Sequence, residues 1–317
     1  MGLSKLMQLA SAFKKNPRFV LMRMLARFKS VRQTVCTLRH YLQKTKWLAY
    51  KRQLRARMSE SVFSTVDLDA FVTELRCNGV AFGLTLPVTI LHEIRSYTEI
   101  TSCYADRERD KGFMANQREQ AESQLGKPIL VAQYLNSEKG CREIEKLRND
   151  PFLLLVAAEY LGSIPNYVGT NVWWTFPVQA SEDDRSRHAH VFHRDVDDFR
   201  FFKFFFYLTD VNAGDGAHIC VPGSHLRPPI TCLLDRILVR RWSDQEISQF
   251  YGDENILNIN GVAGTGFAED TLCMHKGSTP IESSRLLLQM QFALFDYGVQ
   301  NDHAATYSLK QIRKAAI

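Results

Sequence analysis

Acidic residues are missing from the first part of this chain. Residues 1–57 carry 15 Lys and Arg side chains and no Asp or Glu, although the whole chain of 317 residues holds 34 acidic side chains. The remainder therefore has 40 − 15 = 25 basic against 34 acidic side chains, a net charge of −9. This asymmetry predicts a basic arm joined to an acidic body, and it concerns binding partners rather than fold.

Paired cysteines and long apolar runs are also missing. The seven Cys residues show no C-x-x-C spacing and no signal peptide is recognisable, which argues against a disulfide framework or a Cys-rich zinc site. We therefore expect a reducing, cytoplasmic location. No apolar stretch is long enough to cross a bilayer. The hydrophobic content of 45% is that of a globular protein, and the length allows a large core.

The basic arm is predicted to be an amphipathic helix. Apolar residues recur in it at steps of three and four, with most Lys and Arg residues off that stripe. The stripe consists of Leu21, Met24, Leu25, Phe28, Val31, Val35, Leu38 and Leu42. Packing on the acidic body, contact with a partner, and peripheral membrane attachment through residues 1–57 all stay open. Nucleic acid is disfavoured because aromatic and basic residues do not interleave. We place the arm at 1–60 and a folded domain at 61–317.

The first half of the domain is predicted to be helical. The expected helices are Leu68–Arg76, a segment from Pro87 to about Tyr97, Glu138–Arg148 and Pro151–Leu161. Capping residues mark several of their ends, because Asp67 and Asp150 can accept from free backbone amides and Gly79 and Gly162 can end a helix. A strand is expected at Val80–Leu84. The polar segment 101–126 is expected to be a surface loop with a helical piece.

The second half is predicted to consist of short strands. They are expected at Tyr167–Phe176, near 191, and at 200–209, 217–221, Ile256–Ile259, Gly266–Met274 and Arg285–Phe295, with a capped helix at Ser243–Tyr251. The aromatic run from Phe199 to Val211 is typical of a strand buried on both faces. A helical layer followed by about eight strands predicts an antiparallel β-sandwich or barrel with helices on one side.

His193 and Asp195 are the first residues that suggest a metal-binding site. On a strand, two residues of separation place both side chains on one face, where an imidazole and a carboxylate can share a metal ion. The tripeptide alone is a weak signal, but it leads into a buried β-structure, where an unpaired carboxylate would be costly. A second imidazole, for which His275 is our candidate, would complete a 2-His-1-carboxylate triad with open positions.

Further polar residues surround this candidate triad. Arg285 opens an apolar strand, and a buried Arg needs an anionic partner because it stays charged. That partner could be an ordinary structural carboxylate or the carboxylate of a small co-substrate. His188 and His190 lie in the polar, acidic loop 178–190, so we expect them to be exposed and to take no part in the site.

Together these motifs resemble the phytanoyl-CoA dioxygenase-like family of Fe(II)- and 2-oxoglutarate-dependent oxygenases. The resemblance covers roughly 65–300 and is carried by His193-Arg194-Asp195, Phe204 to Val211, Pro222-Gly223-Ser224-His225, His275 and Arg285. It implies a mainly β fold with a helical layer, whose core is a double-stranded β-helix of the cupin or jelly-roll type, preceded by the basic helical arm. Many members have Gln where this chain has Arg194, and the insert 178–190 is long.

The resemblance also implies cofactors and residue roles. His193, Asp195 and His275 match the iron ligands, and Arg285 matches the residue that binds the distal carboxylate of 2-oxoglutarate. Asn171 and Ser278 are weaker candidates for contacts with 2-oxoglutarate, Lys203 is weaker still, and His225 matches a fold marker rather than a ligand.

The implied function is hydroxylation of an unactivated C–H bond of a small-molecule or lipid-like metabolite. The reaction would use O2 and release succinate and CO2. Related halogenases lack the carboxylate found here at Asp195, so desaturation and demethylation are nearer alternatives than halogenation. A non-catalytic scaffold of the same fold, or a cupin-type metalloenzyme that does not use 2-oxoglutarate, would account for the same residues.

Overall fold

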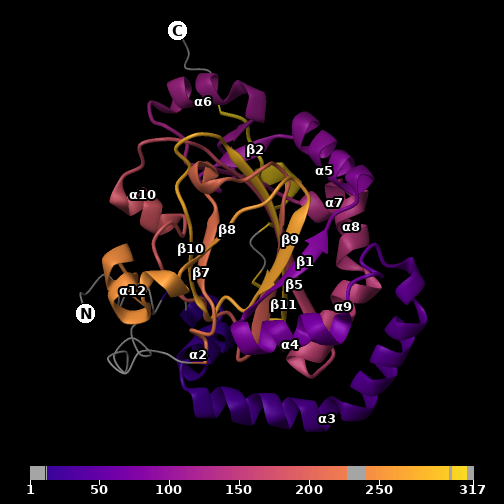
Figure 1. The fold of residues 1–317 in the computed structure, drawn as a ribbon. Coiled ribbons are helices and arrows are strands. Elements are labelled where there is room, and N and C mark those ends of the chain that lie inside the picture. The colour runs from indigo at the N-terminus through magenta and orange to yellow at the C-terminus, as the bar shows by residue number, and fades with distance from the viewer. Residues whose placement is uncertain (1–10, 12, 227–239, 300–301, 313–317) are drawn as a thin grey trace.

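The protein consists of two facing antiparallel β-sheets with a layer of helices on the outside of the larger one, as the computed structural model shows (Figure 1). It describes residues 11, 13–226, 240–299 and 302–312. The first ten residues of the predicted arm lie outside the described residues. No helix in the described ranges is both long enough and apolar enough to span a bilayer.

The larger sheet has eight strands in the order β1-β9-β6-β11-β5-β4-β2-β3, and the smaller has three in the order β10-β7-β8. The strands of the larger sheet are β1 (Val80–Thr85), β2 (Cys103–Ala105), β3 (Gly112–Phe113), β4 (Val131–Tyr134), β5 (Asn166–Thr175), β6 (Phe201–Tyr207), β9 (Thr265–Glu269) and β11 (Arg285–Ala293). Those of the smaller sheet are β7 (His218–Val221), β8 (Leu257–Ile259) and β10 (Met274–Gly277). The predicted double-stranded β-helix core with a helical layer is thereby confirmed.

The helices of the domain were largely predicted from their caps. The described helices are α4 (Leu68–Asn78), α5 (Val88–Ile100), α6 (Arg118–Leu125), α7 (Ser137–Gly140), α8 (Arg142–Arg148), α9 (Pro151–Leu161), α10 (Glu182–Arg187) and α12 (Asp244–Tyr251). Asp67, Asp150 and Ser243 accept from first-turn amides as expected. The single helix predicted over Glu138–Arg148 is wrong, because extended backbone at Cys141 separates α7 from α8.

Segment 101–126 also differs from its prediction. It contributes the short strands β2 and β3 at the edge of the larger sheet as well as α6. Strand β4, which follows it, pairs with both β2 and β5 and was not predicted. Strands of two to four residues are too short to show the alternation by which a strand is recognised in sequence.

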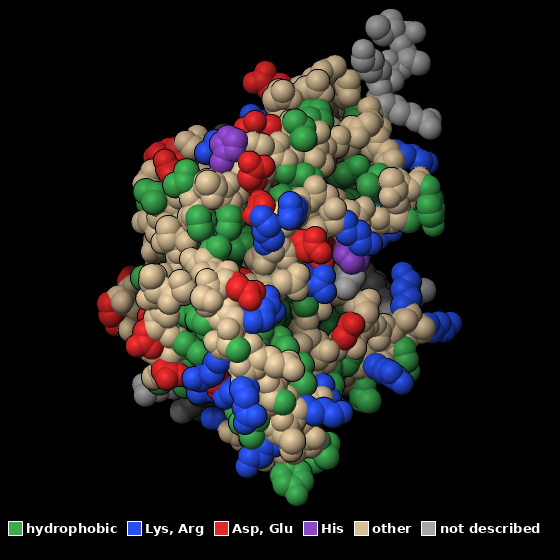
Figure 2. All heavy atoms as spheres, turned by 90° about the vertical axis from the view of Figure 1, so that its right-hand side faces the viewer, with side chains coloured by type: hydrophobic (Ala, Val, Ile, Leu, Met, Phe, Trp, Pro, Cys, Tyr) green, Lys and Arg blue, Asp and Glu red, His purple; other side chains and the backbone are tan. Residues whose placement is uncertain are grey.

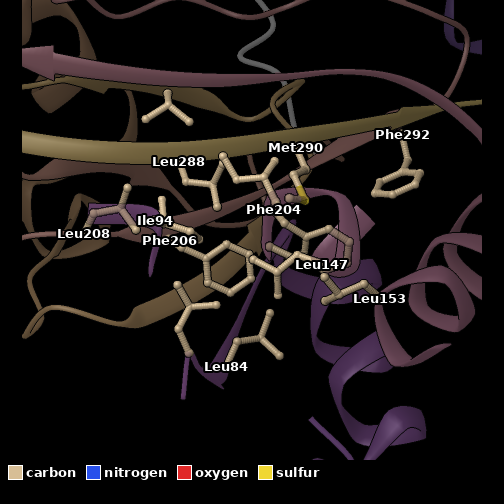
Figure 3. Close-up of a cluster of buried hydrophobic side chains, with 14 of the residues drawn as sticks. Leu84, Ile94, Leu147, Leu153, Phe204, Phe206, Leu208, Leu288, Met290 and Phe292 are labelled. Atoms are coloured by element: carbon tan, nitrogen blue, oxygen red, sulfur yellow. The ribbon is translucent and has the colours of Figure 1, made fainter. Parts of the chain in front are cut away.

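Successive side chains of β6 and β11 point to opposite faces of the larger sheet and so belong to two separate hydrophobic cores. Phe202, Phe204 and Phe206 of β6 and the even-numbered residues of β11 pack against the helical layer, together with Leu147 and Leu153 of the helices (Figure 3). Phe205, Tyr207 and Leu287 point the other way and pack against the smaller sheet. Because side chains alternate along a strand, Lys203 and Arg285 also face the space between the two sheets.

The basic arm forms α2 (Pro17–Leu25) and α3 (Lys29–Ala56), and α3 runs along the outside of the domain (Figure 1). The arm is helical as predicted, and of the alternatives left open for its apolar stripe, packing on the acidic body does not apply to four of its members. Leu21, Phe28, Leu38 and Leu42 are 48–69% exposed. A different face of the arm packs on the domain, through the buried apolar side chains of Met22, Ala26 and Leu54 and through hydrogen bonds made by His40 and Trp47.

Candidate active site

The structure brings His193 and His275 side by side from segments 82 positions apart in the chain numbering. His193 follows a loop and His275 lies in β10 of the smaller sheet. The two residues form an isolated antiparallel bridge, with each backbone amide donating to the other residue's carbonyl at 3.0 Å. Their ring centroids are 4.3 Å apart. The bridge therefore fixes the separation of the two imidazoles.

Asp195 completes a three-residue cluster with these imidazoles. Its Oδ1 lies 3.6 Å from Nε2 of His193, and its Oδ2 lies 3.6 Å from Nε2 of His275. Adjacent ligand atoms around a metal with bonds of about 2.1 Å lie about 3 Å apart, so small side-chain movements would bring these atoms into coordination. The described residues contain one other group of this kind, Glu138, Asp302 and His303, in which Glu138 is already paired with Arg148.

Backbone carbonyls orient both imidazoles. Nδ1 of His193 lies 3.0 Å from the carbonyl oxygen of Val191, and Nδ1 of His275 lies 2.9 Å from that of Cys273. A carbonyl accepts only, so each Nδ1 carries the proton and each Nε2 keeps a free lone pair directed at Asp195. This is the tautomer that a metal-binding histidine requires.

The environment keeps all three side chains in the ligand form. Burial lowers the pKa of both imidazoles below their usual range, well below it for His193. Burial opposes ionisation of Asp195, but Lys203 and the two imidazoles overcome this effect and lower the pKa of the carboxyl group. At neutral pH the cluster is therefore two neutral imidazoles and one carboxylate, which is the state in which these groups bind a metal.

Lys203 is bonded directly to this cluster. Its Nζ lies 2.6 Å from Oδ2 of Asp195 and 3.5 Å from Oδ2 of Asp197. The lysine side chain is only 10% exposed, and its two carboxylate neighbours raise its pKa although burial opposes them. Lys203 thus holds one oxygen of Asp195 and neutralises part of the buried negative charge.

Arg285 is a buried cation without an acid. It is 2% exposed, and the described part of the chain gives it only neutral acceptors. One terminal nitrogen donates to the carbonyl of Gly216 and the other to Oγ1 of Thr175 at 3.3 Å, while Nε has no hydrogen-bond partner. Arg285 therefore forms no structural salt bridge with a described residue. Its positive charge is available to an anionic ligand.

A second buried pair lies behind His275. Nε2 of His218 is 2.5 Å from Oε2 of Glu269, and the rings of His218 and His275 stack with centroids 5.6 Å apart. Burial raises the pKa of Glu269 to about 8 and, with Arg285 and Lys203, lowers the pKa of His218 to about 3. The pair is therefore neutral at neutral pH, with the carboxylic acid donating to the imidazole. The sequence prediction did not include it.

The triad, Lys203 and Arg285 line one cavity of about 280 Å³ between the two sheets. Asn171 also lines it, and its Oδ1 accepts from Nε2 of Gln133 at 2.8 Å.

Ser278 is not among the lining residues, since it follows β10 with its backbone bonded to Ala217. His225 lies outside the cavity beside Cys273. Gln289 and Gln291 share the inward face of β11 with Arg285, a signal that alternation along that strand already contained.

The expectation that His188 and His190 are exposed is wrong. They are 8% and 2% exposed and both line the cavity. Helix α10 folds segment 178–190 back over the domain, so that Nδ1 of His190 lies 2.9 Å from Oγ1 of Thr279. Nε2 of His188 lies 3.5 Å from Asp106. A hydrophilic sequence predicts a surface position on average, but it does not show which side chains a loop turns inward.

Three arginines stand at the mouth of this cavity. Arg107 comes from the β2–β3 turn, Arg187 from the end of α10, and Arg241 from the segment before α12. All three residues are exposed, and none has an ion-pair partner within the described residues. They were not predicted as site residues, because isolated arginines in loops carry no motif.

Comparison with known proteins gives similarities in structure only. No family model matches the chain, and no curated protein sequence matches it either. Among solved structures, it is similar to SnoN, a non-heme alpha ketoglutarate dependent epimerase from nogalamycin biosynthesis, at 14% identity and a TM-score of 0.46 over 72% of this chain and 82% of SnoN. AviO1 from Streptomyces viridochromogenes Tue57 is 14% identical, with a TM-score of 0.44 over 72% of this chain and 95% of AviO1.

HygX from Streptomyces hygroscopicus, solved with nickel, 2-oxoglutarate and hygromycin B, is a third example. It is 13% identical, with a TM-score of 0.46 over 70% of this chain and 86% of HygX. These values describe a distant similarity of chain path.

Proposed function

We propose that this protein is an Fe(II)- and 2-oxoglutarate-dependent oxygenase. The observation that carries the proposal is the presence of two complementary features in one cavity. Three side chains in the ligand form converge within metal-binding reach, and Arg285 supplies a buried positive charge that no described acid neutralises. A metal centre alone would account for the first feature, but not for an arginine whose Nε has no partner.

The residues present fit the two groups. Iron(II) would be held by Nε2 of His193 and His275 and by the carboxylate of Asp195, a facial triad that leaves positions open. Arg285 would pair with the distal carboxylate of 2-oxoglutarate. When bound with O2, these groups supply the oxidising chemistry, with release of succinate and CO2 and hydroxylation of a substrate C–H bond.

The protein's own side chains position and protect this chemistry. Lys203 would hold the second oxygen of Asp195 and so fix the angle at which the carboxylate meets the metal, in the manner of an outer-shell partner. His218 and Glu269 support the ring of His275 by stacking without adding charge. His188 and His190, which follow α10, are buried in the cavity lining and would exclude water from part of it.

The substrate class that this cavity favours is a small molecule with negative charge. With neutral imidazoles, its lining carries five cations, Arg107, Arg187, Lys203, Arg241 and Arg285, against the carboxylates of Asp195 and Asp197. An iron(II) ion and a 2-oxoglutarate dianion would add no net charge. The surplus lies at the mouth, on a domain that is otherwise acidic, so it would attract and orient an anion such as a phosphate ester or a free carboxylate.

Backbone strain points to the same part of the cavity. Four non-glycine residues in the described ranges have positive φ, and three of them, Asp106, Arg107 and Ala189, belong to the two loops that carry Arg107 and Arg187. This conformation is unfavourable for residues with a Cβ and tends to persist at functional sites. Asp106 joins the two loops through His188, whose Nε2 lies 3.5 Å away, and it also pairs with Lys127, which follows α6, at 2.5 Å.

The oxygenase assignment can be tested without knowing the substrate. Fe(II) and then 2-oxoglutarate are added to the purified full chain under anaerobic conditions, and the weak visible charge-transfer band of the chelate is recorded. We expect a band in the wild type that Asp195→Ala abolishes through loss of iron and Arg285→Ala abolishes or weakens through loss of 2-oxoglutarate. Iron bound without a band would favour a cupin-type metalloenzyme, and no iron bound would favour the scaffold.

The substrate class needs its own measurement. Inorganic pyrophosphate, titrated into the metal-free full chain, serves as the anionic probe. The triple variant Arg107→Gln/Arg187→Gln/Arg241→Gln should weaken its binding by about tenfold or more. Arg95→Gln/Arg109→Gln/Arg240→Gln changes the net charge equally but leaves the cavity lining intact, and should bind as the wild type does. Equal losses in both variants would contradict an anion site at the mouth while leaving the oxygenase assignment untouched.

A further inference from the structure

The long helix α3 has an inner face that is firmly docked. Nε1 of Trp47 donates to the carbonyl of Ala158 at 2.8 Å, and Nδ1 of His40 lies 2.7 Å from the carbonyl oxygen of Gly162. Lys51 pairs with Glu159 at 2.5 Å. These contacts hold α3 against α9 and fix which side of the helix faces away from the domain.

The face that points away is apolar. Leu38, Tyr41, Leu42 and Leu48 are 56%, 77%, 69% and 45% exposed. Leu38 and Trp47 are nine residues apart, which at about 100° per residue places them on opposite sides of the helix. Leu38 and Leu42 of the apolar stripe seen in the sequence therefore face solvent, because the contacts of Trp47, His40 and Lys51 turn the opposite face of the helix toward the domain.

Helix α2 repeats this arrangement. Met22 and Ala26 are 2% and 0% exposed and pack with Val196 of the domain. Asn16, its N-cap, donates to the carbonyl of Tyr297 at 2.6 Å. On the far side of the helix, Leu21, Met24 and Leu25 are 39–52% exposed, and Phe28, the N-cap of α3, is 48% exposed. Two successive helices thus present apolar side chains outward while their opposite sides are buried.

Cations flank this outward face, and no acid belongs to it. Lys44, Lys46 and Arg52 are exposed on α3, and residues 1–57 contain no Asp or Glu. Figure 2 shows Lys and Arg side chains gathered with hydrophobic ones at the lower end of the face drawn there, where Figure 1 places α3. An exposed apolar stripe bordered by Lys and Arg is the arrangement that lies in the headgroup region of an anionic membrane.

We propose that α2 and α3 form a peripheral docking surface for an anionic lipid bilayer. The exposed stripe would enter the acyl boundary, while the flanking Lys and Arg residues contact the headgroups. A second copy of the chain is a poorer partner, because it would bring like charges together along the whole contact. Nucleic acid would use the cations but leave the leucines and Tyr41 without a function. The surface is separate from the cavity and independent of the proposed oxygenase activity.

The test uses the full-length protein and floated vesicles. Vesicles of phosphatidylcholine are compared with vesicles that contain about 30 mol% phosphatidylserine, at low and high salt. We expect binding to the anionic vesicles that weakens at high salt, and a partition coefficient at least about tenfold lower for Leu38→Gln/Leu42→Gln. Because both leucines are exposed, this variant should unfold at the wild-type temperature, which circular dichroism checks.

A matched variant tests whether vesicle binding is specific to the arm or arises from any exposed apolar side chain. Val88→Gln/Ile281→Gln removes two other apolar side chains, which are 81% and 79% exposed and lie outside the arm, and should bind vesicles as the wild type does. Equal binding to neutral and anionic vesicles, or an equal loss in both double variants, would overturn the proposal. So would a concentration-dependent dimer that Leu38→Gln/Leu42→Gln abolishes in the absence of vesicle binding, since the stripe would then serve a second copy.

Discussion

Nζ of Lys203 lies 2.6 Å from Oδ2 of Asp195, so a buried lysine holds the carboxylate of the candidate metal centre, while Nε2 of each imidazole lies 3.6 Å from it. The same ammonium group lies 3.5 Å from Asp197, which makes it the main counter-charge for two carboxylates. This relationship gives Lys203 a role in the stability of the metal-free protein that can be separated from any role in metal binding.

Lys203→Met should destabilise the metal-free protein by about 3 kcal/mol, because the two carboxylates lose a buried counter-charge. Mn(II) should then raise the unfolding temperature of the variant by more than it raises that of the wild type, since the ion restores positive charge at Asp195. Chemical denaturation and thermal unfolding with and without Mn(II) measure both effects. Lys146→Met, which removes an ion pair whose lysine side chain is 53% exposed, should cost less than about 1 kcal/mol. A Lys203→Met variant as stable as Lys146→Met would contradict this role.

Arg285→Met should leave the stability of the metal-free protein within about 1 kcal/mol of the wild type, because no described carboxylate loses a partner. In the wild type with Mn(II), 2-oxoglutarate at about 100 times its Kd should stabilise the fold by about 2.7 kcal/mol, and the variant should lose most of this gain. Thermal unfolding with and without 2-oxoglutarate gives both numbers. A large loss of stability in the ligand-free variant would instead indicate a structural ion pair.

Glu269→Gln should remove a pH dependence of stability. Burial raises the pKa of Glu269 from 4.5 to about 8, so the folded state favours the protonated acid. The stability that this group contributes is fully present below pH 4.5 and is lost as the pH rises through 8. A glutamine amide can still donate to His218. Between pH 5 and 9 the metal-free wild type should therefore lose on the order of 3 kcal/mol relative to Glu269→Gln.

The control for this pH series is Glu119→Gln on the exposed side of α6. It should follow the wild type at every pH, because its carboxylate is solvated in both the folded and the unfolded state. Urea denaturation at several pH values, on metal-free protein, compares all three proteins. Parallel curves for wild type and Glu269→Gln would mean that Glu269 ionises normally in the folded state.

Trp47→Ala should cost about 2 kcal/mol, because it removes a half-buried ring and its hydrogen bond to the carbonyl of Ala158. Tyr41→Ala, on the outward face of the same helix and 77% exposed, should change stability by less than about 0.5 kcal/mol. Denaturation curves followed by circular dichroism compare the two. Similar costs would show that α3 is not docked through the face described above.

Alternation and spacing in the sequence already determined much of the fold and of the candidate site. The helix caps at Asp67, Asp150 and Ser243 depend on local hydrogen bonds, so short sequence motifs predicted them. The buried strand β6 followed from its aromatic run, and the pairing of His193 with Asp195 followed from their separation by two residues. In each case the sequence signal lies within a few residues of chain.

The tertiary structure alone decided what depends on long-range contacts. It placed His275 against His193 through a backbone bridge, set Lys203 beside Asp195, and gave Arg285 no acidic partner among the described residues, because β6, β10 and β11 meet only in the folded sheets. It turned His188 and His190 inward and the apolar stripe of α3 outward. A sequence pattern shows that a helix has two faces, but which face is buried depends on what the rest of the chain brings to it.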